Sequence, residues 1–123
     1  MKNLVINATL NTPDVIFDVN EKTLTIKGKS LPEDSISFYS IIDRYLNEYI
    51  THYKSQHLTV ICDMVYINSS SNKSLYNIIK KCVREFKELT VIWKYMEEDE
   101  DMKDLGMDFE HSLAFNFRYV PYI

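Results

Sequence analysis

Glycine is scarce in this sequence of 123 residues: Gly28 and Gly106 are the only two, and they lie far apart. A dinucleotide-binding fingerprint and a phosphate-binding P-loop each need clustered glycines, because bare backbone must approach the phosphate. The sequence therefore excludes both of these nucleotide-binding motifs.

Cysteine is just as scarce, and Cys62 and Cys82 are too far apart for the C-x-x-C spacing of redox and zinc sites. Long apolar runs are also missing. The residues before Pro13 are interrupted by asparagines and threonines, so they lack the apolar core of a secretory signal. The longest apolar stretch, 58–67, is far too short to span a bilayer. We therefore expect a cytoplasmic protein with two free thiols and no membrane insertion.

Basic residues are fewer than acidic ones: the sequence has 14 lysines and arginines and 18 aspartates and glutamates, so its formal net charge is −4. Proteins that bind duplex nucleic acid usually carry the opposite balance, because they must displace counterions from phosphates. A nucleic-acid-binding module is therefore a minor alternative. It depends on a basic stripe in the second predicted helix, and such a stripe is more often a solvated face. The stripe consists of Lys73, Asn77, Lys80, Arg84 and Lys87.

Hydrophobic periodicity divides the chain into nine predicted elements within one domain that covers residues 1–123. Alternation of strands and helices in the middle of the chain predicts parallel strands, and an opening hairpin adds antiparallel ones. We expect an α/β fold in the order β-β-β-α-β-α-β-α-β, with helices packed on a mixed β-sheet that has a parallel core. The predicted strands cover 4–8, 15–19, 23–27, 58–67, 89–95 and 114–120, and the predicted helices cover 33–53, 70–88 and 101–109.

The first predicted helix has an apolar stripe that is wide for a single buried face. Three apolar residues, Tyr39, Leu46 and Ile50, lie beside the face that is predicted to point inward. They are either a candidate partner surface or additional core that the sheet covers, and burial is slightly favoured. The residues predicted to point inward are Phe38, Ile41, Ile42, Tyr45, Tyr49 and Tyr53.

An acidic run at 97–101, followed by Asp104 and Asp108, is the pattern most suggestive of a metal site. An EF-hand loop needs alternating acidic positions and then a glycine, and Gly106 is out of place for that frame. Acidic residues are also favoured at a helix N-terminus, and this structural interpretation is preferred. A small metal-dependent hydrolase that uses the run is the enzyme alternative. The three histidines lack the spacing of a zinc site, so we expect no metal, no cofactor and no catalytic residue.

The most informative segment, residues 66–73, joins a buried strand to the start of the second helix. Asparagine and serine are the preferred helix N-caps, so one of its side chains should cap this helix. A hydroxyl at a helix N-terminus is also a place where an added phosphate is tolerated, because free N–H groups and the positive end of the helix dipole face it. The residues alone leave cap and phosphoacceptor about equally favoured. The polar side chains concerned are those of Asn68, Ser69, Ser70, Ser71 and Lys73.

Short motifs follow one another in a specific order along nearly the whole chain. They are Thr12-Pro13, Phe17-Asp18, Leu24-Thr25-Ile26-Lys27-Gly28, Ser30-Leu31-Pro32-Glu33, Phe38-Tyr39, the segment 66–73, Trp93-Lys94-Tyr95, Asp101-Met102, Gly106 and Phe109. In this order they resemble the SiaC-type regulatory phosphoproteins, a bacterial family with a fold like the STAS domains of anti-sigma-factor antagonists.

The resemblance implies a phosphoacceptor and a set of partners. In that family the loop usually reads Asn-Thr-Ser-Ser and its threonine is phosphorylated; the matching residue here is Ser69, which keeps the hydroxyl. The implied partners are a serine/threonine kinase, a PP2C-type phosphatase and a diguanylate cyclase, which the dephosphorylated protein binds and promotes. The resemblance thus implies a non-enzymatic switch in cyclic-di-GMP signalling and biofilm control. An alternative of the same class is an anti-sigma-factor antagonist that acts by partner switching.

Overall fold

The described part of the chain forms six strands and three helices, in the order that the periodicity predicts. The computed structural model describes residues 1–53 and 57–123. The strands are β1 (Leu4–Ile6), β2 (Asp14–Asp18), β3 (Thr23–Ser30), β4 (His57–Ile67), β5 (Glu88–Met96) and β6 (Arg118–Tyr122), and the helices are α1 (Ser35–Tyr53), α2 (Ser69–Glu85) and α3 (Glu100–Leu113).

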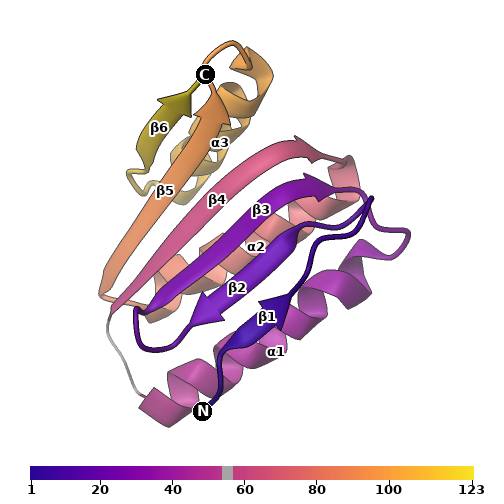
Figure 1. Cartoon of the computed structure of the whole chain (residues 1–123). Coiled ribbons are helices and arrows are strands. Elements are labelled where there is room, and N and C mark those ends of the chain that lie inside the picture. The colour runs from indigo at the N-terminus through magenta and orange to yellow at the C-terminus, as the bar shows by residue number, and fades with distance from the viewer. Residues whose placement is uncertain (54–56) are drawn as a thin grey trace.

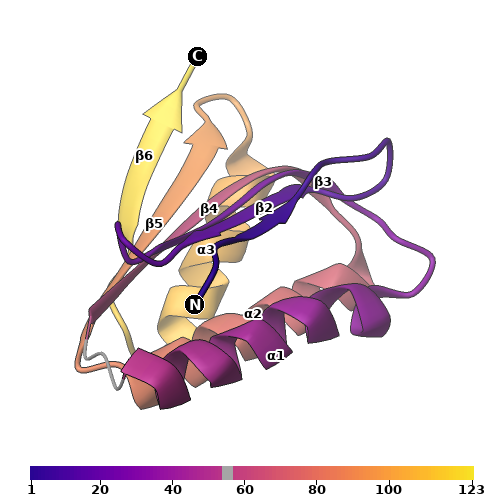
Figure 2. The ribbon, with the colours of Figure 1, turned by 60° about the horizontal axis from the view of Figure 1, so that its bottom comes forward.

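The strands lie in the sheet in the same order as in the sequence, from β1 at one edge to β6 at the other. The pairs β1/β2 and β2/β3 are antiparallel, and the strands from β3 to β6 are parallel. The mixed sheet with a parallel core is therefore confirmed. Each helix connects two neighbouring parallel strands and each connection advances in the same direction, so right-handed crossovers place all three helices on one face. Figures 1 and 2 show this arrangement, in which no helix covers the opposite face.

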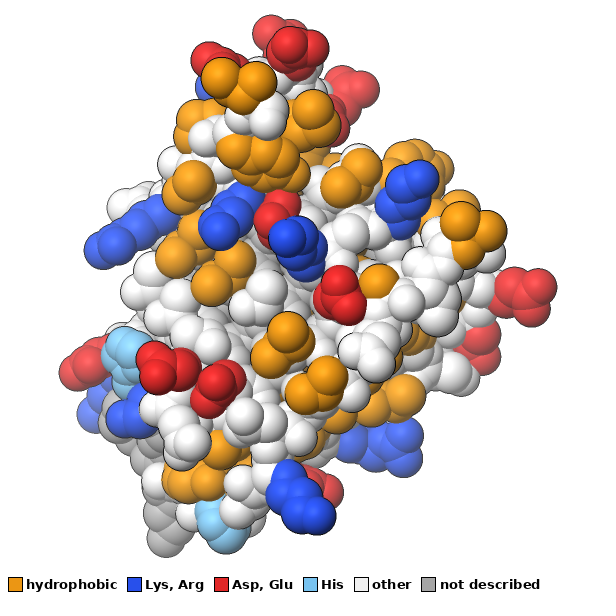
Figure 3. Space-filling model, in the orientation of Figure 1, with side chains coloured by type: hydrophobic (Ala, Val, Ile, Leu, Met, Phe, Trp, Pro, Cys, Tyr) orange, Lys and Arg blue, Asp and Glu red, His pale blue; other side chains and the backbone are white. Residues whose placement is uncertain are grey.

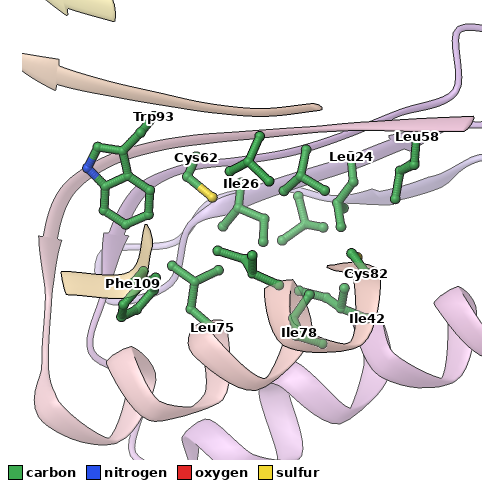
Figure 4. Packing of buried hydrophobic residues seen from close by; sticks show 14 of the residues in the cluster. Leu24, Ile26, Ile42, Leu58, Cys62, Leu75, Ile78, Cys82, Trp93 and Phe109 are labelled. Carbon is green, nitrogen blue, oxygen red and sulfur yellow. The ribbon is translucent and has the colours of Figure 1, made fainter. Parts of the chain in front are cut away.

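The hydrophobic core lies between that one face of the sheet and the helices (Figure 4). Inward-facing residues alternate along the strands, as the pleat requires. The face predicted for α2 is confirmed, because Leu75, Ile78, Ile79 and Cys82 are buried and Val83 is half-buried, whereas the basic stripe is exposed. The core strands contribute Val15, Phe17, Leu24, Ile26, Leu58, Val60, Cys62, Met64, Val91, Trp93 and Tyr95.

The inward face of α1 differs from the prediction. Ile41 and Tyr53, which were predicted to point inward, are 41% and 42% exposed. The buried stripe is rotated around the helix, because α1 packs against α2 as well as against the sheet, where the rings of Tyr45 and Tyr49 contact that of Phe17. Its members are Ser35, Tyr39, Ile42, Leu46 and Tyr49.

The C-terminal boundaries also differ from the prediction. Helix α3 continues to Leu113 and ends where Ala114 adopts a left-handed conformation. The predicted strand over 114–120 is therefore wrong in its first half, because pairing with β5 begins only where Arg118 lies opposite Ile92. Phe117 is nevertheless buried, since its ring stacks on that of Trp93 at 6.1 Å between centroids.

Candidate functional site

The serine-rich segment lies at the carboxyl end of β4, where a single residue, Asn68, separates the strand from α2. Loops at the carboxyl ends of parallel strands are the usual place for binding sites in α/β proteins. The backbone N–H of Asn68 donates a hydrogen bond to the carbonyl oxygen of Ser30 at 3.0 Å, so the end of β3 holds the start of the helix in position.

Asn68 is the N-cap of α2. Its backbone is extended (φ −82°, ψ 171°), and its side-chain oxygen accepts a hydrogen bond from the backbone N–H of Ser71 at 2.9 Å. The hydroxyl of Ser70 lies 3.4 Å from the same oxygen. Of the residues considered for this role, the asparagine is therefore the cap, and neither Ser70 nor Ser71 is.

The three serines that follow differ in accessibility. Ser69 and Ser70 are exposed, whereas Ser71 is completely buried. The hydroxyl of Ser71 has no hydrogen-bond partner within the described part of the chain. A modifying enzyme that acts on the folded protein can therefore reach only Ser69 and Ser70, and Ser69 is the first residue with helical backbone.

The start of α2 is itself electropositive, although Asp99 and Asp101 of α3 line the neighbouring cavity. The first turn of α2 contains no acidic residue. The N–H groups of a first helical turn lack partners within the helix, and the helix dipole adds roughly half a positive charge there. Lys73, which is exposed, is one turn further along the helix. A phosphate on Ser69 would thus be next to backbone donors and a cation, which is the environment that anions prefer.

Tyr39 supports this site from inside the protein and is not part of a partner surface. Its side chain is only 3% exposed, and its hydroxyl lies 2.7 Å from the hydroxyl of Ser30. Ser30 is the residue whose backbone carbonyl accepts the hydrogen bond from the N–H of Asn68. Burial raises the pKa of Tyr39 to about 12, so the phenol stays protonated at neutral pH. The side chain thereby links α1 to the start of α2.

Of the two alternatives for the wide stripe on α1, burial, which the sequence slightly favoured, is confirmed for Tyr39 and Leu46, and the partner surface is wrong for these two residues. Leu46 is completely buried, like Tyr39, because both lie on the face that packs against the sheet and α2. Ile50 is half-buried and packs against the same core. The exposed large hydrophobic side chains of α1 are instead those of Ile36, Ile41 and Tyr53.

A cavity of about 310 Å³ lies beside the site, between the end of β4 and the N-termini of α2 and α3. Its wall includes Val65 and Tyr66, which are 48% and 51% exposed. Its other lining residues are Ile67, Asn72, Asp99, Asp101, Met102 and Leu105. The apolar residues that continue β4 into the serine segment are the only signal of this hollow in the sequence.

The acidic run forms the start of α3. Asp99 is the N-cap, with its carboxylate accepting a hydrogen bond from the N–H of Met102 at 3.0 Å, and Glu100 and Asp101 lie in the first turn. Within residues 1–53 and 57–123, no three His, Cys, Asp or Glu side chains are grouped so that they could hold a metal ion. Both thiols are buried, and burial raises the pKa of Cys62 and Cys82. None of the helices in these ranges is long and apolar enough to cross a membrane.

Fold and site together define a small mixed α/β domain whose accessible site is a hydroxyl-rich helix N-terminus. The family model described as SiaC family regulatory phosphoprotein matches residues 6–122. The chain therefore belongs to the SiaC family, as the motifs had indicated.

One sequence relative and two solved structures are similar to this chain over nearly its whole length. An uncharacterised protein of Pseudomonas aeruginosa (strain UCBPP-PA14) is 22% identical over 120 residues, which are 95% of this chain and 94% of that protein. The structure of SiaC of Pseudomonas aeruginosa is 21% identical, with a TM-score of 0.85 over 99% of this chain and all of that one. A crystal structure of SiaC as the activator of diguanylate cyclase SiaD, from the same organism, superposes with a TM-score of 0.84 at 21% identity over 97% of this chain and 99% of that one.

Proposed function

We propose that this chain is a phosphorylation-controlled activator of a diguanylate cyclase and has no catalytic activity of its own. In its unphosphorylated form it binds the cyclase in the cytoplasm. A serine/threonine kinase phosphorylates Ser69, and a PP2C-type phosphatase removes the phosphate. The residues that position and receive the phosphate are Asn68, Ser69, Ser70 and Lys73.

The exposed hydroxyl of Ser69, on the first helical residue of an N-terminus without acidic side chains, carries this proposal. Membership of a family of regulatory phosphoproteins supports it, and so does the relative that activates a cyclase. In the transfer, the Ser69 oxygen bonds to the terminal phosphorus of ATP, the bond from that phosphorus to the bridging oxygen breaks, and ADP leaves. The hydroxyl proton passes to a base of the kinase.

Phosphate at this position changes binding without unfolding the protein. It adds roughly 1.5 to 2 negative charges at neutral pH, and the helix N-terminus stabilises them in the free protein. A partner that packs on Tyr66, Val65 and the neutral Ser69 must strip water from this charge when it binds. The phosphorylated form should therefore bind the cyclase at least about tenfold more weakly, which corresponds to about 1.4 kcal/mol.

The test combines modification with binding. The protein is incubated with the cognate kinase and ATP, the modified residue is located by mass spectrometry, and both forms are titrated against the cyclase while cyclic-di-GMP synthesis is measured. We expect phosphate on Ser69, and weaker binding together with lower cyclase activity for the modified form.

Ser70→Ala is the matched control for Ser69→Ala, because both hydroxyls are exposed and neighbouring. The Ser69 variant should resist the kinase and remain a constitutive activator, whereas the Ser70 variant should behave as the unaltered protein. Phosphate that is found only at other residues, or equal cyclase affinity of the two forms, would contradict the proposal.

A further inference from the structure

The sheet face opposite the helices is open, although parallel sheets are ordinarily covered on both faces. The strands from β3 to β6 are parallel, and all three helices lie on the other side (Figures 1 and 2). Figure 3 looks onto this open face, where charged, apolar and polar side chains are mixed. A second molecule that covers it must therefore match a specific pattern of side chains and not only an apolar area.

The side chains of the open face form rows across the sheet, because residues in register on neighbouring strands point to the same side. One row alternates in charge: Asp14 pairs in register with Lys27, Lys27 with Asp63, and Asp63 with Lys94. Lys27 is exposed and the other three are half-buried. Neither lysine forms an ion pair with a residue of the described ranges.

This alternating row is complementary to itself. Consider a twofold axis that is parallel to the strands and lies in the interface, midway between β3 and β4. It places β3 of one copy opposite β4 of the other and β2 opposite β5, and every residue keeps its position along the strand direction. Lys27 of one copy then meets Asp63 of the other, and Asp14 meets Lys94. We infer that the open face of the sheet binds a second copy of this chain, so that two sheets pack face to face with their helices outside.

The same axis matches the other rows of the face. The row of Thr23, Thr59 and Thr90 faces its own copy, and so does the row that contains Ile61 and Ile92. Within these rows Thr23 meets Thr59 and Ile16 meets Ile92, whereas Thr25 meets Ile61 and Asp18 meets Thr90, so no like charges are placed opposite each other. Two sheets packed in this way keep their strands nearly aligned, which is a common arrangement of stacked sheets.

The area of this face is large enough for a weak dimer. Four central strands about 4.8 Å apart, with about seven residues each at ~3.3 Å, give roughly 450 Å² of flat area on each copy. Side-chain corrugation brings the total buried by two copies close to ~1,200 Å², the lower end of specific interfaces. The dimer should therefore dissociate in the micromolar range, where sedimentation velocity measures it directly.

Charge reversal tests the arrangement. Lys27→Glu places two carboxylates opposite each other at both symmetry-related contacts, and Asp63→Lys places two ammonium groups there. Each variant alone should weaken self-association about tenfold or more. An equimolar mixture of the two variants should form a heterodimer, because every one of these contacts is then again between opposite charges, and the double variant should dimerise with itself.

Tyr122→Phe is the control for Asp63→Lys, because the tyrosine hydroxyl donates a hydrogen bond to that carboxylate at 2.9 Å. The control should still dimerise, and circular dichroism should show that all variants are folded. A protein that remains monomeric up to submillimolar concentration would overturn the inference, as would a dimer that charge reversal does not affect. Monomers whose cyclase binding is lost on reversal would assign the face to the cyclase instead. The switch at Ser69 is tested separately, so either proposal can fail alone.

Discussion

The N-termini of α2 and α3 use the same capping geometry with opposite charge. In both, the side-chain oxygen of the cap accepts a hydrogen bond from the backbone N–H three residues later. In α2 the N–H of Ser71 donates to Asn68 at 2.9 Å, and in α3 the N–H of Met102 donates to Asp99 at 3.0 Å. Helix α3 adds two carboxylates in its first turn, whereas α2 has none. The positive end of α3 is thus permanently neutralised, and that of α2 is left for a charge that an enzyme can add and remove.

The largest effect is expected where α3 is fixed to the sheet. A Cβ atom at Gly106 would lie 2.7 Å from the indole ring of Trp93, whose N–H donates to the carbonyl oxygen of Met102 at 2.9 Å. Gly106→Ala should therefore lower the free energy of unfolding by about 1–3 kcal/mol, since the buried ring cannot move freely. Urea denaturation followed by the fluorescence of the single tryptophan measures this loss. Stability within error of the original, with exposed Lys103→Ala as control, would show that the helix is held less tightly than the structure indicates.

Removing the two caps compares the helix starts directly. Asp99→Ala should lower the free energy of unfolding by about 1–2 kcal/mol, and Asn68→Ala by about 1 kcal/mol, because only the first also removes a charge that the helix dipole favours. Ser71→Ala is the control: its buried hydroxyl has no partner to lose, so the change should be neutral or slightly stabilising. The shift of the urea midpoint at constant m-value gives all three numbers. A greater loss from Ser71→Ala than from Asn68→Ala would refute the cap assignment.

Asn68→Asp would make the start of α2 resemble that of α3. The added carboxylate should raise the free energy of unfolding by about 0.3–1 kcal/mol at low ionic strength. Phosphate on Ser69 should raise the free energy of unfolding of the original protein by a similar amount. In the Asn68→Asp variant the phosphate lies next to a second negative charge, so it should give no stabilisation or should destabilise the fold. Thermal unfolding of the four species, with and without phosphate, measures the coupling. An unchanged effect of phosphate in the variant would mean that the helix N-terminus does not hold it.

Acid provides the finest comparison, because it titrates carboxylate caps and leaves an amide cap unchanged. Asp34 precedes α1, and its carboxylate accepts hydrogen bonds from the hydroxyl of Ser37 at 2.7 Å and from its backbone N–H at 3.1 Å. These bonds lower the pKa of Asp34 below 3.8, so the stabilisation is present above pH 3.8 and is lost as the pH falls through the folded-state pKa. Hydrogen exchange should show that the Ser37 amide loses protection in acid before the Ser71 amide does.

Asp34→Asn is the matched variant for this experiment. It should remove the pH dependence of protection at Ser37 and leave that at Ser71 unchanged. Simultaneous loss of protection at both amides in the original protein would indicate global unfolding and would contradict a local effect of the cap.

Sequence periodicity predicted α2 better than α1 for a physical reason. The apolar and basic residues of α2 are segregated, so only one orientation of the helix buries the right ones. Helix α1 is apolar around much of its circumference, and its orientation depends on contact with both α2 and the sheet, which a local pattern does not contain. For the same reason, Tyr39 and Leu46 could be placed only by the structure.

The site was predicted in its composition but not in its arrangement. The sequence of segment 66–73 predicted that the site lies there, that one of its polar side chains caps the helix, and that its serine hydroxyls are candidate phosphoacceptors. The burial of Ser71 and the exposure of Ser69 depend on how α2 is rotated against β4. The cavity beside them depends on α3, which comes from a distant part of the chain. Such contacts between distant segments are the part of a site that a single sequence leaves undetermined.

The agreement between strand order in the sheet and strand order in the chain has a kinetic consequence. Every strand after β1 joins the one that precedes it in the sequence, so the sheet can grow at one edge while the ribosome is still adding residues. The two antiparallel pairs need only short connections, whereas each parallel pair must wait for the helix between its strands, so the antiparallel side of the sheet should form first. Growth ends at β6, where Pro121 lacks the N–H that a further strand would need. Pro121 thus also protects this edge of the sheet against addition of another chain.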